Sequence, residues 1–214
     1  MLVILPLLSG CPPGPDFSTR DCSMLTFDHP AADRWAPYAA GDRLDFTGPN
    51  ASASYTVVDV DTPVPENASV RGSVPTDEIG CVVDKIYTLG SEDGAHAFAL
   101  EFSQGELVAA LPEDEPLSLA ILAPPSRSSP IVLTYIALVP LDDEGRFTEA
   151  DVTFEERGAV GGTTYDDLYS SRFPASALSQ YGPDEVRLEG VSLSRGTGLV
   201  ALTRSDVGEL FLVR

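Results

Sequence analysis

The chain has 214 residues, of which 43% are hydrophobic and 21% charged. This length and composition are typical of one globular domain with a substantial core, and they exclude a largely disordered chain. Acidic residues outnumber basic ones 33 to 13, which gives a formal net charge of −20. Because a surface of that charge repels phosphate backbones, we expect no nucleic acid as a partner.

The chain begins with a short apolar run, residues 2–8, that leads into the sequence LSGC at residues 8–11. This order resembles the lipobox of bacterial lipoproteins. The resemblance implies cleavage before Cys11, diacylglycerol on its thiol, and a fatty acyl group such as palmitate on the new amino terminus. In the Gram-negative members of that family, a residue other than Asp after the cysteine, here Pro12, implies delivery to the outer membrane.

A proline-rich segment, PPGP at residues 12–15, follows the lipobox. Because proline cannot donate to a sheet ladder, this segment favours an extended tether. The alternative is that the apolar run forms a buried first strand. We predict a signal peptide at 1–10, a tether at 11–30 and a β domain at 31–214, in an exported protein that a lipid anchors to the cell envelope.

The three cysteines are Cys11, Cys22 and Cys81. If Cys11 carries lipid, Cys22 and Cys81 remain as an even pair in an oxidising compartment, which favours a disulfide between them. Such a bond closes about 60 residues and contributes roughly 4 kcal/mol in the chain-entropy description. The alternative is two unrelated buried thiols.

From residue 42 onward, short segments with period-2 or β-branched patterns alternate with turn-forming clusters. These patterns predict strands and no long helix. The fold class is therefore all-β, with a single antiparallel domain that forms a sandwich or a curved half-barrel. The predicted strands are 43–46, 55–61, 81–89, 95–102, 107–111, 131–139, 152–155, 186–194, 198–203 and 209–213.

Several local features carry more specific predictions. Residues 104–105 predict a tight connection, and residues 131–139 are apolar on both faces, which predicts a central strand. The apolar parity changes at residues 189–190, which predicts a β-bulge. The best helical candidate is 166–169, and 174–181 is expected to form a short turn.

Three further segments resemble steps in uncharacterised bacterial β-rich envelope lipoproteins. Residues 35–46 contain WAPY and then GDRLDF, which is similar to their W-x-P-Y … G-D-x-x-x-F opening. Residues 161–168 (GGTTYDDL) and 196–200 (GTGLV) are similar to later steps, with Leu168 in place of Val. The resemblance implies a β-rich envelope protein with no assigned activity.

The sequence shows no recognisable reaction chemistry. The two histidines, His29 and His96, accompany no G-x-S-x-G elbow, no H-E-x-x-H and no C-x-x-C, so we predict no catalytic residue, cofactor or metal site. His96 has the apolar parity of its strand and is expected at the edge of the core. Residues 140–151 lack the first acidic ligand of an EF-hand loop and favour a hairpin turn.

The expected function is a binding or structural role in the cell envelope, with the membrane as a partner through the N-terminal lipid. A further envelope protein is a possible partner. Two alternatives remain open. A hydrophobic cavity would favour a carrier of an apolar ligand, and two carboxylates about 5–10 Å apart in a cleft would favour a secreted hydrolase.

Overall fold

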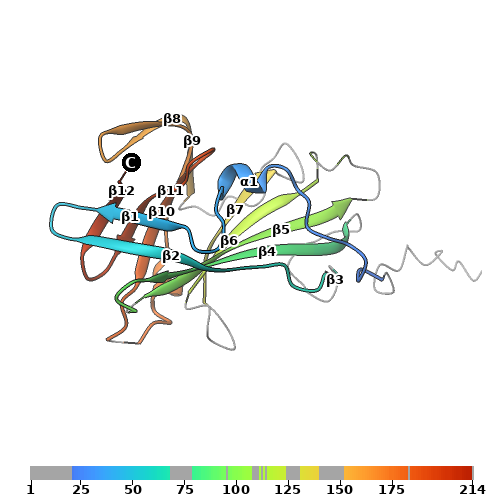
Figure 1. Ribbon diagram of the computed structural model, residues 1–214, viewed down its shortest axis with the longest axis horizontal. Coiled ribbons are helices and arrows are strands. Elements are labelled where there is room, and N and C mark those ends of the chain that lie inside the picture. Colours follow the sequence, from blue (N-terminus) through green and yellow to red (C-terminus); the bar gives the residue numbers. More distant parts are fainter. Residues whose placement is uncertain are drawn as a thin grey trace, which may run out of the picture.

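The computed structural model shows one strongly curved sheet, accompanied in the described residues by the short helices α1 and α3 (Figure 1). The elements are α1 Ala32–Trp35, β1 Arg43–Thr47, β2 Ser52–Asp61, β3 Glu66–Asn67, β4 Ile79–Ser91, β5 Ala97–Leu107, β6 Leu117–Ala123, β7 Ile131–Val139, β8 Val152–Val160, β9 Thr163–Arg172, α3 Ala175–Leu178, β10 Leu188–Ser194, β11 Gly198–Arg204 and β12 Gly208–Leu212. The structure describes residues 21–67, 79–94, 96–107, 111, 113, 115–123, 131–139, 152–182 and 184–213. Within these ranges no helix has the length and apolar character needed to cross a membrane.

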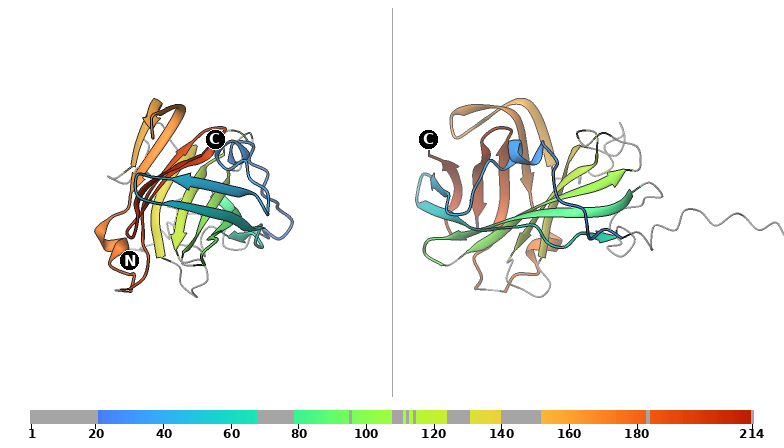
Figure 2. Two further views of the ribbon diagram at one scale, coloured as in Figure 1. Left: turned by 60° about the vertical axis from the view of Figure 1, so that its left-hand side comes forward. Right: turned by 45° about the vertical axis from the view of Figure 1, so that its right-hand side comes forward.

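The strands follow one path, β7-β6-β5-β4-β2-β1-β12-β11-β10-β9-β8, and β3 adds to the edge of β4. The strand pairs along this path are antiparallel, and β1 joins the two halves by pairing with both β2 and β12. The sheet curls into a nearly closed, barrel-like shape (Figure 2). The prediction of a single antiparallel all-β domain is confirmed.

Side chains fill the interior of the curled sheet. Alternation along each strand directs every second residue inward, and the inward positions carry large aromatic and aliphatic groups. The largest fully buried aromatic side chains are Phe46, Tyr55, Tyr87, Phe98 and Phe102. Since full burial of such a side chain contributes about 3 kcal/mol, this aromatic core is a main source of stability.

One end strand of the sheet, β7, faces β9, the neighbour of the other end strand β8, along a line that we call the seam. No backbone ladder joins these strands within the described residues, and side chains bridge them instead. The Tyr169 hydroxyl donates to the Ala137 carbonyl (3.3 Å), and the Ser171 hydroxyl donates to Thr134 Oγ1 (3.1 Å). Side-chain hydrogen bonds therefore close the seam, whereas backbone hydrogen bonds join the neighbouring strands elsewhere in the sheet.

A disulfide attaches the N-terminal segment to the sheet. Cys22 and Cys81 are bonded, with their Cα atoms 5.8 Å apart, as predicted. Further along, Gln104 on β5 accepts a hydrogen bond from the Asp28 backbone N–H (3.2 Å). The described part of the predicted tether, residues 21–30, thus contacts β4 and β5, whereas Cys11 and the signal-peptide prediction lie outside the described residues.

The structure confirms one local prediction in the C-terminal half. The register between β10 and β11 shifts between Leu188 and Gly190, which is the predicted β-bulge. The short turn predicted after Pro174 contains α3.

Three local predictions are wrong. Strand β5 runs without a turn through Gly105 to Leu107, because its backbone keeps pairing with β4. Strand β7 is terminal in the sheet, and its outward Val132 and Tyr135 remain 36% and 38% exposed. Residues 166–169, the helical candidate, belong to β9, where backbone pairing with β8 and β10 overrides local propensity.

Candidate functional site

A pocket of about 520 Å³ lies at the seam, and we call it the seam pocket. Its walls come from residues 29–31, from α1, from β7 to β9 and from the turn between β10 and β11. Figure 1 shows α1 near β7 and β9, where it covers this part of the sheet. The lining residues are His29, Pro30, Ala31, Arg34, Trp35, Glu113, Leu138, Phe154, Asp167, Tyr169 and Arg195.

Three aromatic rings form a ladder along one wall of the seam pocket. The ring centroids of Trp35 and Tyr169 are 5.1 Å apart, and those of Tyr169 and Phe154 are 4.8 Å apart. Phe154 and Tyr169 are cross-strand neighbours on β8 and β9, whereas Trp35 comes from α1. Burial decreases along the ladder, from Trp35 at 6% exposed to Phe154 at 49%. The ladder therefore ends in a ring that solvent and a ligand can reach.

Two arginines accompany the ladder. Arg34 precedes Trp35 on α1, and its carbonyl accepts a hydrogen bond from the Gly196 N–H (2.5 Å). This bond places Arg34 beside Arg195. The Arg195 side chain donates to Asp167 (3.1 Å), while Arg34 makes no side-chain hydrogen bond or ion pair with the residues that the structure describes.

Asp167 has an unusual backbone conformation. Its φ is +48°, the only positive φ of a non-glycine among the described residues. Aspartate tolerates this region better than most residues, yet the conformation still costs on the order of 1 kcal/mol. The same residue accepts a backbone hydrogen bond from the Arg195 N–H (3.3 Å) besides the side-chain ion pair. Strained backbone of this kind often accompanies functional sites.

A polar cluster, in which His29, Gln104 and Glu115 are buried and Asp28 is exposed, holds the N-terminal wall of the pocket. The Ala31 N–H donates to His29 Nδ1 (3.2 Å), and His29 Nε2 donates to the Glu115 carbonyl (3.1 Å). Gln104 donates to the carboxylates of both Glu115 (2.5 Å) and Asp28 (3.2 Å). Burial raises the pKa of Glu115 above its ordinary value. We call these four side chains, Asp28, His29, Gln104 and Glu115, the clasp.

The three segments that resemble envelope lipoproteins meet beside the seam pocket. The Tyr38 hydroxyl accepts a hydrogen bond from the Leu199 N–H (2.5 Å) and donates to the Thr197 carbonyl (3.4 Å). Gly198 has a φ of +82°, and a Cβ there would lie 2.0 Å from the Tyr38 hydroxyl, so only glycine fits. Burial raises the pKa of Tyr38. With Asp167 bound to Arg195, all three segments contribute to one corner of the molecule.

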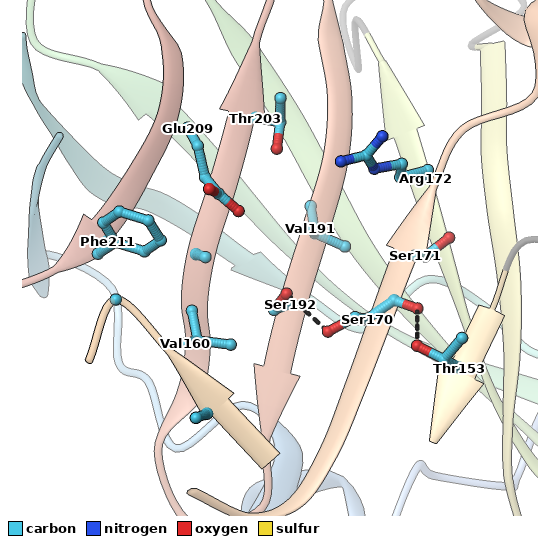
Figure 3. Close-up of a pocket in the computed structure, with 13 residues that line it drawn as sticks. Thr153, Val160, Ser170, Ser171, Arg172, Val191, Ser192, Thr203, Glu209 and Phe211 are labelled. Atoms are coloured by element: carbon cyan, nitrogen blue, oxygen red, sulfur yellow. Dashed lines mark hydrogen bonds between the residues drawn. The ribbon is translucent and has the colours of Figure 1, made fainter. Parts of the chain in front are cut away.

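A second open site, the hairpin groove, lies on the outer face of the sheet under the β8–β9 hairpin (Figure 3). Its volume is about 520 Å³. Across β9 to β12 the strand register forms two rows, Arg172–Gly190–Thr203–Glu209 and Ser170–Ser192–Ala201–Phe211. Figure 3 shows Arg172 and Glu209 on opposite sides of a floor of short side chains. The groove offers hydroxyl groups and one charge of each sign, but a single aromatic ring.

A third polar centre, which we call the core centre, comprises the buried Tyr55, His96 and Arg204 and the exposed Asp206. Arg204 donates two hydrogen bonds to Asp206 (3.0 and 2.7 Å) and one to the Tyr55 hydroxyl (3.3 Å), and Tyr55 in turn contacts His96 Nδ1 (3.2 Å). His96 is 6% exposed, and its Nε2 has no hydrogen-bond partner among the described residues. Burial, followed by the charge of Arg204, lowers the pKa of His96 to about 4.

Sequence reasoning identified some of these residues but not the site. His96, which was expected at the edge of the core, is buried, and the predicted disulfide is present. The described residues contain no group of three or more His, Cys, Asp or Glu side chains placed to hold a metal ion. The seam pocket was missed, and its local signal was the single Trp35 with Arg34 beside it. Phe154 and Tyr169 are more than a hundred residues away and carry no local signal of their own.

The fold and the sites define an all-β domain with a seam closed by side chains and an aromatic pocket at that seam. Comparison with protein-family models, with curated proteins and with solved structures found no match. The function of the protein is therefore inferred from its own residues and geometry.

Proposed function

We propose that this protein is an exported, lipid-anchored envelope protein whose β domain binds a small ring-containing ligand in the seam pocket. Two observations support the location. The LSGC sequence at residues 8–11 supports lipid attachment at Cys11 and anchoring in the outer membrane. The Cys22–Cys81 disulfide supports an oxidising compartment outside the cytoplasm.

The aromatic ladder at the seam is the observation that carries the binding role. Ligand sites combine aromatic surface with a few convergent polar groups, and the seam pocket offers three rings, two guanidinium groups and one ion pair. The exposed ring of Phe154 rests on Tyr169, so a ligand that stacks on it meets a surface that is already ordered.

The two alternatives receive less support from the geometry. A carrier of an apolar ligand needs an empty apolar interior, whereas the aromatic core fills the inside of this sheet. A carboxylate-based hydrolase would rely on Glu113 and Asp167 in the seam pocket, but Arg195 already engages Asp167. Binding without turnover is the better-supported role.

Thermal unfolding in the presence of ring compounds tests the binding role. The panel contains neutral and anionic sugars and neutral and anionic aromatic compounds. Because a ligand that binds only the folded state raises the unfolding temperature, at least one member should stabilise the wild type. Phe154→Ala should abolish that shift. Val58→Ala, which truncates another exposed apolar side chain (58% exposed) on β2, should keep it. No shift with any member, or an undiminished shift in Phe154→Ala, would contradict the proposal.

Intact mass of the membrane-extracted protein tests the anchor. We expect a chain that begins at Cys11 and carries lipid, and a Cys11→Ser variant that is not lipidated and leaves the membrane fraction. An unmodified Cys11 in the membrane-extracted protein would contradict lipid attachment. This outcome would leave the binding role standing, because the two claims rest on different residues.

A further inference from the structure

We infer that the ligand of the seam pocket carries a carboxylate on a six-membered ring, with Arg34 binding the carboxylate and Phe154 stacking on the ring. This inference rests on the proposed binding function and names the chemical class of the ligand.

The charge of Arg34 is available to a ligand. The side chain is exposed, lines the pocket, and makes no side-chain hydrogen bond or ion pair with the described residues. Its acidic neighbour Asp33 is engaged elsewhere, since Lys85 on β4 donates to it (2.8 Å). Within the part of the chain that the structure describes, Arg34 thus presents an unpaired guanidinium group, whose planar fork matches the two oxygens of a carboxylate.

A second guanidinium group reinforces the first. Arg195 follows Ser194 at the end of β10, and the hydrogen bond between the Gly196 N–H and the Arg34 carbonyl brings the backbone of Arg34 next to this turn; both arginines line the pocket. Asp167 fixes Arg195 through both its backbone and its side chain. Arg195 is therefore held in a fixed position and adds positive charge at the pocket, whereas Arg34 has no partner among the described residues and can bind the carboxylate of a ligand.

The two arginines at the seam pocket stand out because the chain as a whole is strongly acidic. With 33 acidic and 13 basic residues, the average surface repels anions. The described lining of the seam pocket contains two basic residues, Arg34 and Arg195, and two acidic residues, Asp167 and Glu113. Asp167 is already paired with Arg195, so Glu113, which is exposed, is the carboxylate among the described lining residues that opposes an anionic ligand.

The ladder specifies the other half of the ligand. Phe154 is 49% exposed while its inner neighbour Tyr169 supports it at 4.8 Å between centroids. A flat ring can stack on the free face of Phe154, and both an aromatic ring and the C–H face of a sugar ring provide such a surface. A ring of either kind that bears a carboxylate satisfies the ladder and Arg34 together.

Matched pairs of ligands test the inference, with Trp35 as the reporter. Trp35 is the only tryptophan and lies in the pocket, so its emission reports on binding there. The pairs are glucuronate with glucose, and benzoate with benzamide, which separate a sugar ring from an aromatic one. In at least one pair the carboxylate should bind about tenfold tighter than its neutral partner, which is typical of a hydrogen-bonded charged contact.

Variants assign that preference to its residues. Arg34→Gln should remove the preference for the carboxylate, whereas Arg157→Gln, an exposed arginine on β8 outside the pocket, should leave it intact. Glu113→Gln should tighten binding of the carboxylate by removing a like charge. Equal binding of both members in both pairs, or a preference that survives Arg34→Gln, would overturn the inference. If a neutral compound binds and depends on Phe154, the proposed function stands while the ligand class fails.

Discussion

Arginine serves two different purposes in this molecule, and the core centre and the seam pocket show the contrast. Arg204 is 3% exposed and uses its guanidinium group fully, with two hydrogen bonds to Asp206 and one to Tyr55. Arg34 and Arg195 are exposed, and Arg34 makes no side-chain contact of this kind with the described residues. A buried charge must be compensated within the fold, whereas an exposed charge beside an aromatic ladder is free for recognition.

The largest effect should follow from truncating the core centre. Arg204→Ala removes three hydrogen bonds and leaves a cavity beside Tyr55, so we expect a loss of about 4 kcal/mol in the free energy of unfolding. Urea unfolding measures it. Arg34→Gln serves as the matched control and should change stability by less than about 0.5 kcal/mol. Similar losses in both variants would erase the distinction between the two centres.

Removing the disulfide should lower stability by roughly 3–4 kcal/mol, because its closed loop restricts the unfolded chain. The variant is Cys22→Ser with Cys81→Ser. The clasp holds residues 28–31 independently of the disulfide, so Trp35 emission should stay native below the unfolding transition. A change in Trp35 emission without denaturant would show that the disulfide, and not the clasp, shapes the seam pocket.

Acid should weaken the core centre through His96. Its folded pKa is lowered to about 4 from 6.5, so the neutral form stabilises the fold above the unfolded pKa, and this stability is lost as pH falls through the folded pKa. The groups that face His96 are Tyr55, Arg204, Asp206 and Asp93. Between pH 7 and pH 4 we expect the wild type to lose roughly 3 kcal/mol more than His96→Gln.

Chemical denaturation across that pH range provides the measurement. The difference between the wild type and His96→Gln isolates this histidine, because all other titrating groups are common to both proteins. A parallel pH dependence of the two proteins would contradict the role assigned to His96.

The smallest effect should come from the ion pair at the seam. Asp167 and Arg195 are 33% and 45% exposed in their side chains, so Asp167→Asn should cost less than about 1 kcal/mol in the free energy of unfolding. Asparagine also tolerates the positive φ of this position. Thermal unfolding at low and high salt measures the change. A loss above 2 kcal/mol would show that this pair supports the fold as Arg204 does.

The sequence predicted most of the strands, because their alternation and turn residues are local signals. It missed β6 and β9 for identifiable reasons. Leu117–Ala123 is a short run beside a proline and was not recognised, and β9 contains two adjacent aspartates, one with a positive φ, that obscure its strand pattern. Strand order depends on pairings between distant segments, which local patterns do not reveal. The prediction of a central strand at β7 is therefore wrong, because β7 is terminal in the sheet.

The candidate site was less predictable than the fold. Arg34 and Trp35 are adjacent in sequence, but their partners Phe154, Tyr169 and Arg195 reach them only when the sheet curls and the seam closes. That closure depends on pairings between strands far apart in the chain, which no local pattern encodes. The disulfide was predictable because three cysteines leave one pair once Cys11 is assigned to lipid.

Backbone amide chemical shifts on addition of a carboxylate-bearing ring compound test the central claim most directly, because they locate the ligand. Glucuronate and benzoate are the two probes. The account predicts shifts that cluster at Arg34, Trp35, Phe154, Asp167 and Gly196 around the seam pocket. Shifts that cluster instead at Val160, Ser192, Thr203 and Phe211 would place the ligand in the hairpin groove and contradict the account.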